Sequence, residues 1–138
     1  QNAEFNRFDY LNCGGYCGAA NLTNAYLYAA DLTDADLTQA DLSNAYLYEA
    51  DLTDANLRYA DLTDASLFGA DLTSADLWNA DLTNASLAVA DLTDAYLGSA
   101  WLFYADFTWA TVKDTKFTGA FWYQTVWIDG VTYDTPQA

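Results

Sequence analysis

Residues 30–60 read ADLTDADLTQADLSNAYLYEADLTDANLRYA, and this stretch decides the fold of the chain. Alanine stands at every fifth position from Ala20 to Ala110, and leucine follows two residues after each alanine from Leu22 to Leu102. Larger apolar residues then continue the leucine position, at Phe107, Val112, Phe117, Trp122 and Trp127. A repeat of this length has to be explained before any other feature of the chain.

Neither an α-helix nor a flat strand places these alanines and leucines on one side. Leucines five residues apart lie about 140° apart around a helix, so no apolar face forms. In a flat strand the side chains alternate between two sides, and each new alanine would point away from the core. The backbone must therefore turn once per pentad. This predicts a solenoid whose coils pair through their backbones at a spacing of about 4.8 Å.

The number of sides in each coil follows from a second pattern. Alternate pentads are nearly uniform and the pentads between them vary, which requires an even number of sides. The segment Tyr26-Leu27-Tyr28 also returns twenty residues later as Tyr46-Leu47-Tyr48. We therefore predict an all-β, four-sided solenoid that forms a single domain of about 22 repeats.

The run from Ala30 to Asp34, ADLTD, resembles the A(D/N)LXX motif of the pentapeptide-repeat family, and the resemblance covers about residues 20–129. It implies a right-handed, four-sided β-helix with the leucine and the preceding alanine inside. We accordingly expect an irregular N-terminal coil or cap over residues 1–19. The β-helix is expected over 20–129 and a C-terminal tail over 130–138.

The net charge is −16, from twenty acidic residues against four lysines and arginines. A surface this negative repels nucleic acid and anionic lipid, so we expect no direct binding to nucleic acid. No stretch approaches the run of about 18 apolar residues that a transmembrane segment needs. The charge is compatible with plain solubility, and also with attraction to cations or to basic proteins.

The sequence begins at Gln1 and contains no methionine, and Cys13 and Cys17 stand close together beside Gly14 and Gly15. We interpret these features as those of an exported chain, extracellular or periplasmic, with a cytoplasmic location as the alternative. A disulfide between the two cysteines is the favoured interpretation, and two free thiols are the alternative.

The sequence offers little for catalysis or for a cofactor. It has no histidine and no glycine-rich phosphate loop, and its carboxylates stand at a repeat position on flat faces without an obvious cleft. We therefore predict a protein that is not an enzyme and that needs no cofactor or metal.

With four pentads in each coil, one column of carboxylates is expected to form an acidic ladder, at Asp31, Asp51, Asp71 and Asp91. Like charges about 5 Å apart in water repel by roughly 1 kcal/mol for each pair. Hydrogen bonds from turn amides to the carboxylates offset this repulsion in the favoured interpretation, and bound cations do so in the alternative.

Aromatic residues carry the strongest functional signal, because the positions that flank each leucine point outward. The expected interaction surface consists of Tyr26, Tyr28, Tyr46, Tyr48, Tyr59, Phe68, Trp78, Tyr96, Trp101, Phe103 and Tyr104. A terminal-coil interface that closes the rod or docks on another subunit is expected at Phe117, Phe121, Trp122, Tyr123 and Trp127. Contiguous surface aromatics are typical of binding interfaces.

These features favour a structural or interaction protein that associates with itself, as an oligomer or head-to-tail filament, through its aromatic faces and open ends. The alternative is an acidic rod that mimics DNA and binds a protein such as gyrase, as some members of the family do. An ice- or cation-binding surface, built on the threonine columns and the acidic ladder, is the third hypothesis.

Overall fold

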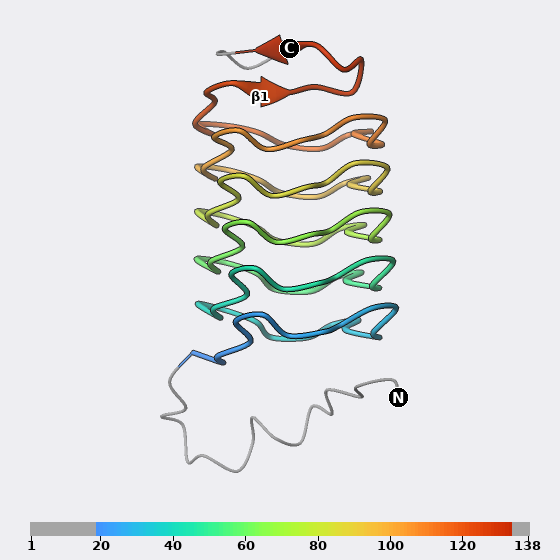
Figure 1. The fold of residues 1–138 in the computed structure, drawn as a ribbon, viewed down its shortest axis with the longest axis vertical. Coiled ribbons are helices and arrows are strands. Elements are labelled where there is room, and N and C mark those ends of the chain that lie inside the picture. The colour runs from blue at the N-terminus through green and yellow to red at the C-terminus, as the bar shows by residue number, and fades with distance from the viewer. Residues whose placement is uncertain (1–18, 134–138) are drawn as a thin grey trace.

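The computed structural model describes residues 19–133. The chain winds into a stack of similar coils that form a rod, with the first coil at one end and the last at the other (Figure 1). The predicted N-terminal cap and most of the predicted tail lie outside the described residues, as do Cys13 and Cys17. The proposed boundaries, the repeat count and the disulfide therefore stay predictions.

Parallel bridges join residues that are twenty positions apart. Asn21 pairs with Asp41, and Asp41 pairs in turn with Asp61. Equivalent bridges recur at every fifth residue from Asn21 to Val126. One coil therefore contains four pentads, which confirms the prediction of four sides.

Backbone hydrogen bonds hold each coil to the coils on both sides of it. In the pentad 41–45, the amides of Leu42 and Asn44 donate to carbonyls of the next coil at 2.7 and 2.9 Å. The amide of Asp41 donates to the previous coil at 2.9 Å, and that of Ala45 donates back to the Leu42 carbonyl at 3.0 Å. Four of the five amides are thus satisfied by the backbone alone, three between coils and one within the turn.

The four sides of the rod differ in their outward residues, and we name them in chain order. The first face begins with pentad 21–25, the aromatic face with 26–30, the acidic face with 31–35 and the fourth face with 36–40. Each face includes the pentads that follow at intervals of twenty residues, as the bridges place them.

The interior consists of the alanine and leucine columns that the sequence predicts. Every leucine of the repeat from Leu22 to Leu102 is buried, and so is the phenylalanine that follows at Phe107. The alanines between the leucine layers are buried from Ala40 to Ala110. Burying one leucine completely contributes about 2 kcal/mol, so these columns supply the main apolar driving force of the fold.

A left-handed backbone conformation forms each corner. The second residue after each leucine has a positive φ, such as 57° at Asp34 and 58° at Asn44. Asparagine and aspartate tolerate this conformation better than other residues with a β-carbon, which explains their frequency at the corners. Val89 differs from the other described corner residues because it is β-branched, and its φ is 64°. A positive φ is unfavourable for a β-branched residue.

We therefore expect Val89→Asn to raise the free energy of unfolding by about 1 kcal/mol, because it relieves backbone strain at an exposed corner. Urea unfolding followed by circular dichroism measures the change. Val131→Asn is the matched control, since Val131 is similarly exposed without a positive φ. An equal effect of the two substitutions would contradict the strain at Val89.

Within residues 19–133, strands longer than one bridge occur only at the C-terminal end of the rod. β1 (Thr125–Val126) pairs antiparallel with β2 (Thr132–Tyr133), and the two strands lie at the C-terminal end of the rod (Figure 1). Val126 also pairs with Asp106 of the preceding coil. The hairpin is therefore attached to the rod and adds a strand beyond its last coil. Within residues 19–133 there is no helix long and apolar enough to cross a membrane.

Candidate interaction surfaces

The acidic ladder forms as the spacing predicts. Asp31, Asp51, Asp71 and Asp91 are successive bridge partners on the acidic face. Each accepts, through Oδ1, a hydrogen bond from the amide two residues further on, at 2.9 to 3.1 Å. These carboxylates satisfy the one amide of the pentad that the backbone leaves without a partner.

Asparagine performs the same task elsewhere in the rod. Asn21 Oδ1 accepts from the Thr23 amide at 3.1 Å, and Asn56 Oδ1 accepts from the Arg58 amide at 3.2 Å. The role therefore needs a side-chain oxygen and not a negative charge. No group of three or more acidic, cysteine or histidine side chains within the described residues is arranged to hold a metal ion.

Asp71→Ala is expected to lower the free energy of unfolding by about 1 kcal/mol, because it leaves the Thr73 amide without its acceptor. Asp71→Asn keeps the acceptor and removes a charge from the ladder, so it is expected to be neutral or stabilising. Urea unfolding at low ionic strength tests both variants. A loss of stability in Asp71→Asn as large as that in Asp71→Ala would show that the charge itself matters.

Hydrogen bonds also change how the carboxylates titrate. Bonds from the side chain and amide of Thr33 lower the pKa of Asp31, and bonds from Ser43 lower the pKa of Asp41. As the pH falls below 3.8, the ordinary pKa of an aspartate, these two side chains are protonated in the unfolded chain but still ionised in the fold. These two groups therefore stabilise the fold above that pH, and the stabilisation disappears as the pH falls through their lowered pKa.

The thermal midpoint is accordingly expected to fall on acidification from about pH 6 to pH 2, and to fall less in an Asp31→Asn, Asp41→Asn double variant. Scanning calorimetry at fixed ionic strength measures both curves. A midpoint that rises in acid would mean that relief of repulsion along the ladder outweighs the lost hydrogen bonds.

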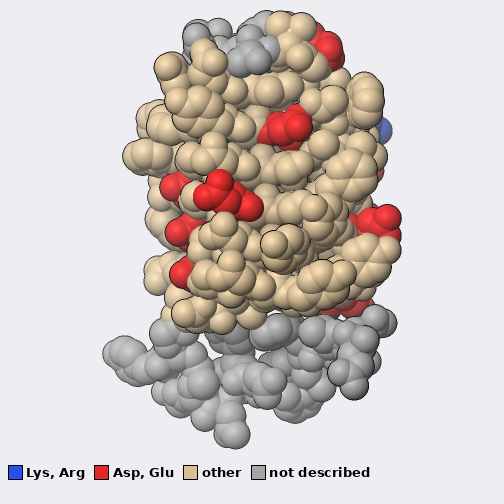
Figure 2. Space-filling model, viewed as in Figure 1, with Lys and Arg blue, Asp and Glu red and all other residues tan. Residues whose placement is uncertain are grey.

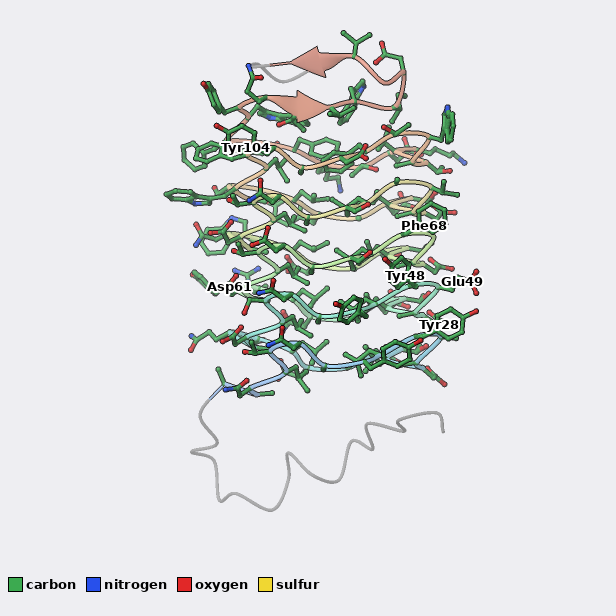
Figure 3. The ribbon with its side chains drawn as sticks, viewed as in Figure 1. Tyr28, Tyr48, Glu49, Asp61, Phe68 and Tyr104 are labelled. Atoms are coloured by element: carbon green, nitrogen blue, oxygen red, sulfur yellow. The ribbon has the colours of Figure 1, made fainter. Side chains whose placement is uncertain are left out.

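A contiguous patch of rings covers the first coils of the aromatic face, and we call it the Tyr patch: Tyr26, Tyr28, Tyr46, Tyr48 and Phe68. Ring centroids lie 6.1 to 6.3 Å apart from Tyr26 through Tyr46 and Tyr48 to Phe68. All five rings are exposed, and Tyr26 retains 74% of its accessible surface. Figure 3 shows the labelled Tyr28, Tyr48 and Phe68 on the same side of the rod.

Glu49 fixes one ring of the Tyr patch. The Tyr28 hydroxyl donates a hydrogen bond to Glu49 Oε2 at 3.0 Å, and the two side chains lie beside each other in Figure 3. This bond and the nearby negative charge raise the pKa of Tyr28. The Tyr28 side chain therefore stays neutral and oriented at physiological pH.

A second group of rings lies near the C-terminal end, and we call it the terminal patch: Trp101, Phe103, Tyr104, Phe121 and Tyr123. Trp101 contacts both Phe103 and Phe121, with centroids 5.6 and 5.5 Å apart. Tyr123 packs edge-on against Tyr104 at 5.4 Å. Phe121 and Tyr123, which the sequence assigned to a terminal-coil interface, thus join residues assigned to the interaction surface.

The other terminal-coil candidates face inward. Phe117, Trp122 and Trp127 pack with Phe107 at the C-terminal end of the core, with ring centroids 5.2 to 6.2 Å apart; Trp122 is buried, and Phe117 and Trp127 are half-buried. They occupy the leucine position of the pentad, and the other two candidates occupy outward positions. Of the five residues of the predicted terminal-coil interface, three therefore pack together in the last coil and two belong to the outer surface. The interface itself stays a prediction.

The fourth face holds a smaller cluster around Trp78. Tyr59 packs edge-on against Trp78 at 5.0 Å, and the Arg58 guanidinium lies 4.7 Å from the Trp78 ring centroid. Arg58 also donates to Asp76 Oδ2 at 3.0 Å, and this ion pair raises the pKa of Arg58. The sequence interpretation missed Arg58 and Asp76, although the twenty-residue period places Arg58 next to Trp78.

Tyr96 belongs to the same cluster and depends on a glycine. A β-carbon at Gly98 would lie 2.7 Å from Tyr96 Cζ and 3.0 Å from Trp78 Cδ1. The missing side chain at Gly98 therefore leaves the space that the two rings occupy.

The stacked coils, the alanine and leucine interior and the turn in every pentad define a β-solenoid protein with outward-facing rings and carboxylates. A family model described as pentapeptide repeats in eight copies matches the chain at residues 20–58, 30–67, 50–88, 70–103 and 80–119. The chain belongs to the pentapeptide repeat family. This confirms the family resemblance, and with it the expectation of a right-handed, four-sided β-helix.

Solved structures agree with this assignment. A pentapeptide repeat protein of the Arabidopsis thaliana thylakoid lumen is 32% identical with a TM-score of 0.66, over 72% of this chain and 69% of that one. A pentapeptide repeat protein from Nostoc PCC 7120 is 39% identical with a TM-score of 0.60, over 73% and 76% of the two chains. A comparison with curated protein sequences found no match.

The trypsin-treated form of QnrB1, a plasmid-mediated fluoroquinolone resistance protein, is 19% identical with a TM-score of 0.42. The match covers 78% of this chain and 65% of that one. This likeness is too distant to carry an argument about function.

Proposed function

We propose that this chain is a non-enzymatic structural or interaction protein that associates with copies of itself through its exposed aromatic surfaces. The Tyr patch is the observation that carries the proposal. Its five rings are exposed on one side of the rod, four of them in contact with one another, and tyrosine is a residue that binding interfaces favour. A rod of stacked coils presents such a patch on a regular backbone, so binding needs little ordering of the main chain.

The C-terminal hairpin supports lateral association better than head-to-tail growth. β2 already pairs with β1 at the end of the last coil, where a second copy would have to add its first coil. An edge covered in this way is protected from pairing with another chain. The Tyr patch and the terminal patch, by contrast, are exposed on the sides of the rod.

An exported location, extracellular or periplasmic, is part of the proposal. It is supported by the relative from the Arabidopsis thylakoid lumen. Fractionation of cells that express the full-length protein tests the location.

The second candidate function is that of an acidic mimic of DNA, with a protein such as gyrase as the partner. The acidic face favours it, because this face carries Asp31, Asp34, Asp51, Asp54, Asp71, Asp91, Asp94 and Asp114. A supercoiling assay with purified gyrase separates the two functions. Inhibition that persists in a variant with a disrupted Tyr patch would favour the mimic.

Self-association predicts a mass above that of the monomer by size exclusion with light scattering. Tyr48→Ser, at the centre of the Tyr patch, is expected to weaken association about tenfold or more, because interface tyrosines commonly contribute over 1 kcal/mol. Thr53→Ser, on the acidic face, is the control that should change nothing. A monomer at the highest soluble concentration would overturn the proposal.

A further inference from the structure

Two copies of a chain with a net charge of −16 repel each other, so the distribution of charge limits where they can meet. Acidic side chains are scattered over the side of the rod that Figure 2 shows. The aromatic face carries few carboxylates. Its outward positions in the pentads from 26–30 to 106–110 include only Glu49 and Asp106. A second copy can therefore approach here with little repulsion.

The size of the outward side chains changes along the aromatic face. The two N-terminal coils present Tyr26, Tyr28, Tyr46 and Tyr48. Two coils further on, the same columns present only Ser86 and Ala88. Large rings thus raise the face at these N-terminal coils, and the short side chains of Ser86 and Ala88 leave it lower two coils further on, before Trp109 projects from the last coil of the face.

We propose that the occupant of the aromatic face is the same face of a second copy, running antiparallel, with the two-fold axis at pentad 66–70. The inference rests on the proposed self-association and specifies its geometry. The two-fold axis lies in the interface and runs parallel to the bridged segments. Each column of outward residues in one copy therefore meets the same column of the other copy, with the order of the coils reversed. Tyr48 then faces Ala88 of the second copy, and Tyr46 faces its Ser86.

Three other positions of the face fit the same register. Trp109, which retains 77% of its accessible surface, faces Ala29 of the second copy. Phe68 meets its own symmetry mate at the axis, where Gly69 leaves space beside it. Asp106, which already accepts from Thr108, faces Tyr26, whose hydroxyl supplies a further donor.

A parallel arrangement lacks this complementarity. It would bring the tyrosines of the two copies against one another and leave Ser86 and Ala88 facing short side chains across a gap. Close packing at the centre of an interface requires large groups opposite small ones. An isologous antiparallel pair also closes on itself, which predicts a dimer and not a filament.

Charged substitutions at the facing pair Tyr48 and Ala88 test the register. Ala88→Glu places a carboxylate against Tyr48 of the second copy, at both symmetry-related sites. We expect it to weaken the dimer about 100-fold or more by analytical ultracentrifugation, because a buried unpaired charge is costly. The double variant Tyr48→Lys, Ala88→Glu pairs opposite charges across the interface, and we expect it to recover at least tenfold of the lost affinity.

The control is Thr63→Glu, which adds the same charge at the same pentad position on the first face and should leave the dimer unchanged. Thermal midpoints establish that all variants remain folded. A wild-type chain that associates but is insensitive to Ala88→Glu, or is not rescued by the double variant, would overturn the antiparallel register and leave self-association standing. A monomeric wild-type chain would overturn both.

A size exchange provides a second test that involves no charge. Ala88→Tyr alone is expected to prevent the close approach of Tyr48, and Tyr48→Ala alone to leave a gap. The double variant Tyr48→Ala, Ala88→Tyr restores one large and one small side chain at each pair. Tighter association of the double variant than of either single variant supports the register, and an additive loss contradicts it.

Discussion

The hydrogen bonds between successive coils are the constraint on which the rest of the structure depends. Each pentad donates three amides along the rod axis, and the partners recur at intervals of twenty residues. This pairing holds only if the chain turns after every fifth residue, which in turn requires a positive φ at each corner. The alanine and leucine columns follow, because only one small and one larger apolar residue in each pentad point toward the axis.

Since the backbone and the interior already determine the fold, the outward positions are free to differ between faces. The aspartates and asparagines before each leucine still contribute to stability, because they accept the remaining turn amide. The rings of the Tyr patch have no comparable role within the rod: they are exposed and contact mainly one another. A surface feature that the fold does not need is the natural place to look for function.

The period of the sequence predicted most of what a single column contains. It placed Asp31, Asp51, Asp71 and Asp91 in one line, and it placed Trp122 and Trp127 at the leucine position inside the rod. The terminal-coil interface, in which these tryptophans close the rod or dock on another subunit, stays a prediction. The bond between Tyr28 and Glu49 and the contact between Arg58 and Trp78 join neighbouring coils through long side chains, whose conformations no repeat pattern specifies.

The twenty-residue repeat also determines which changes of length the rod tolerates during evolution. Duplication of one complete coil would lengthen the rod and leave every column on its own face. Insertion of a single pentad would keep the interior intact, but it would rotate everything beyond it by a quarter turn. The terminal patch would then move to a different side from the one it now shares with the aspartates of the first face. An insertion therefore preserves the surface pattern only if it adds a multiple of four pentads, whereas the core tolerates the insertion of a single pentad.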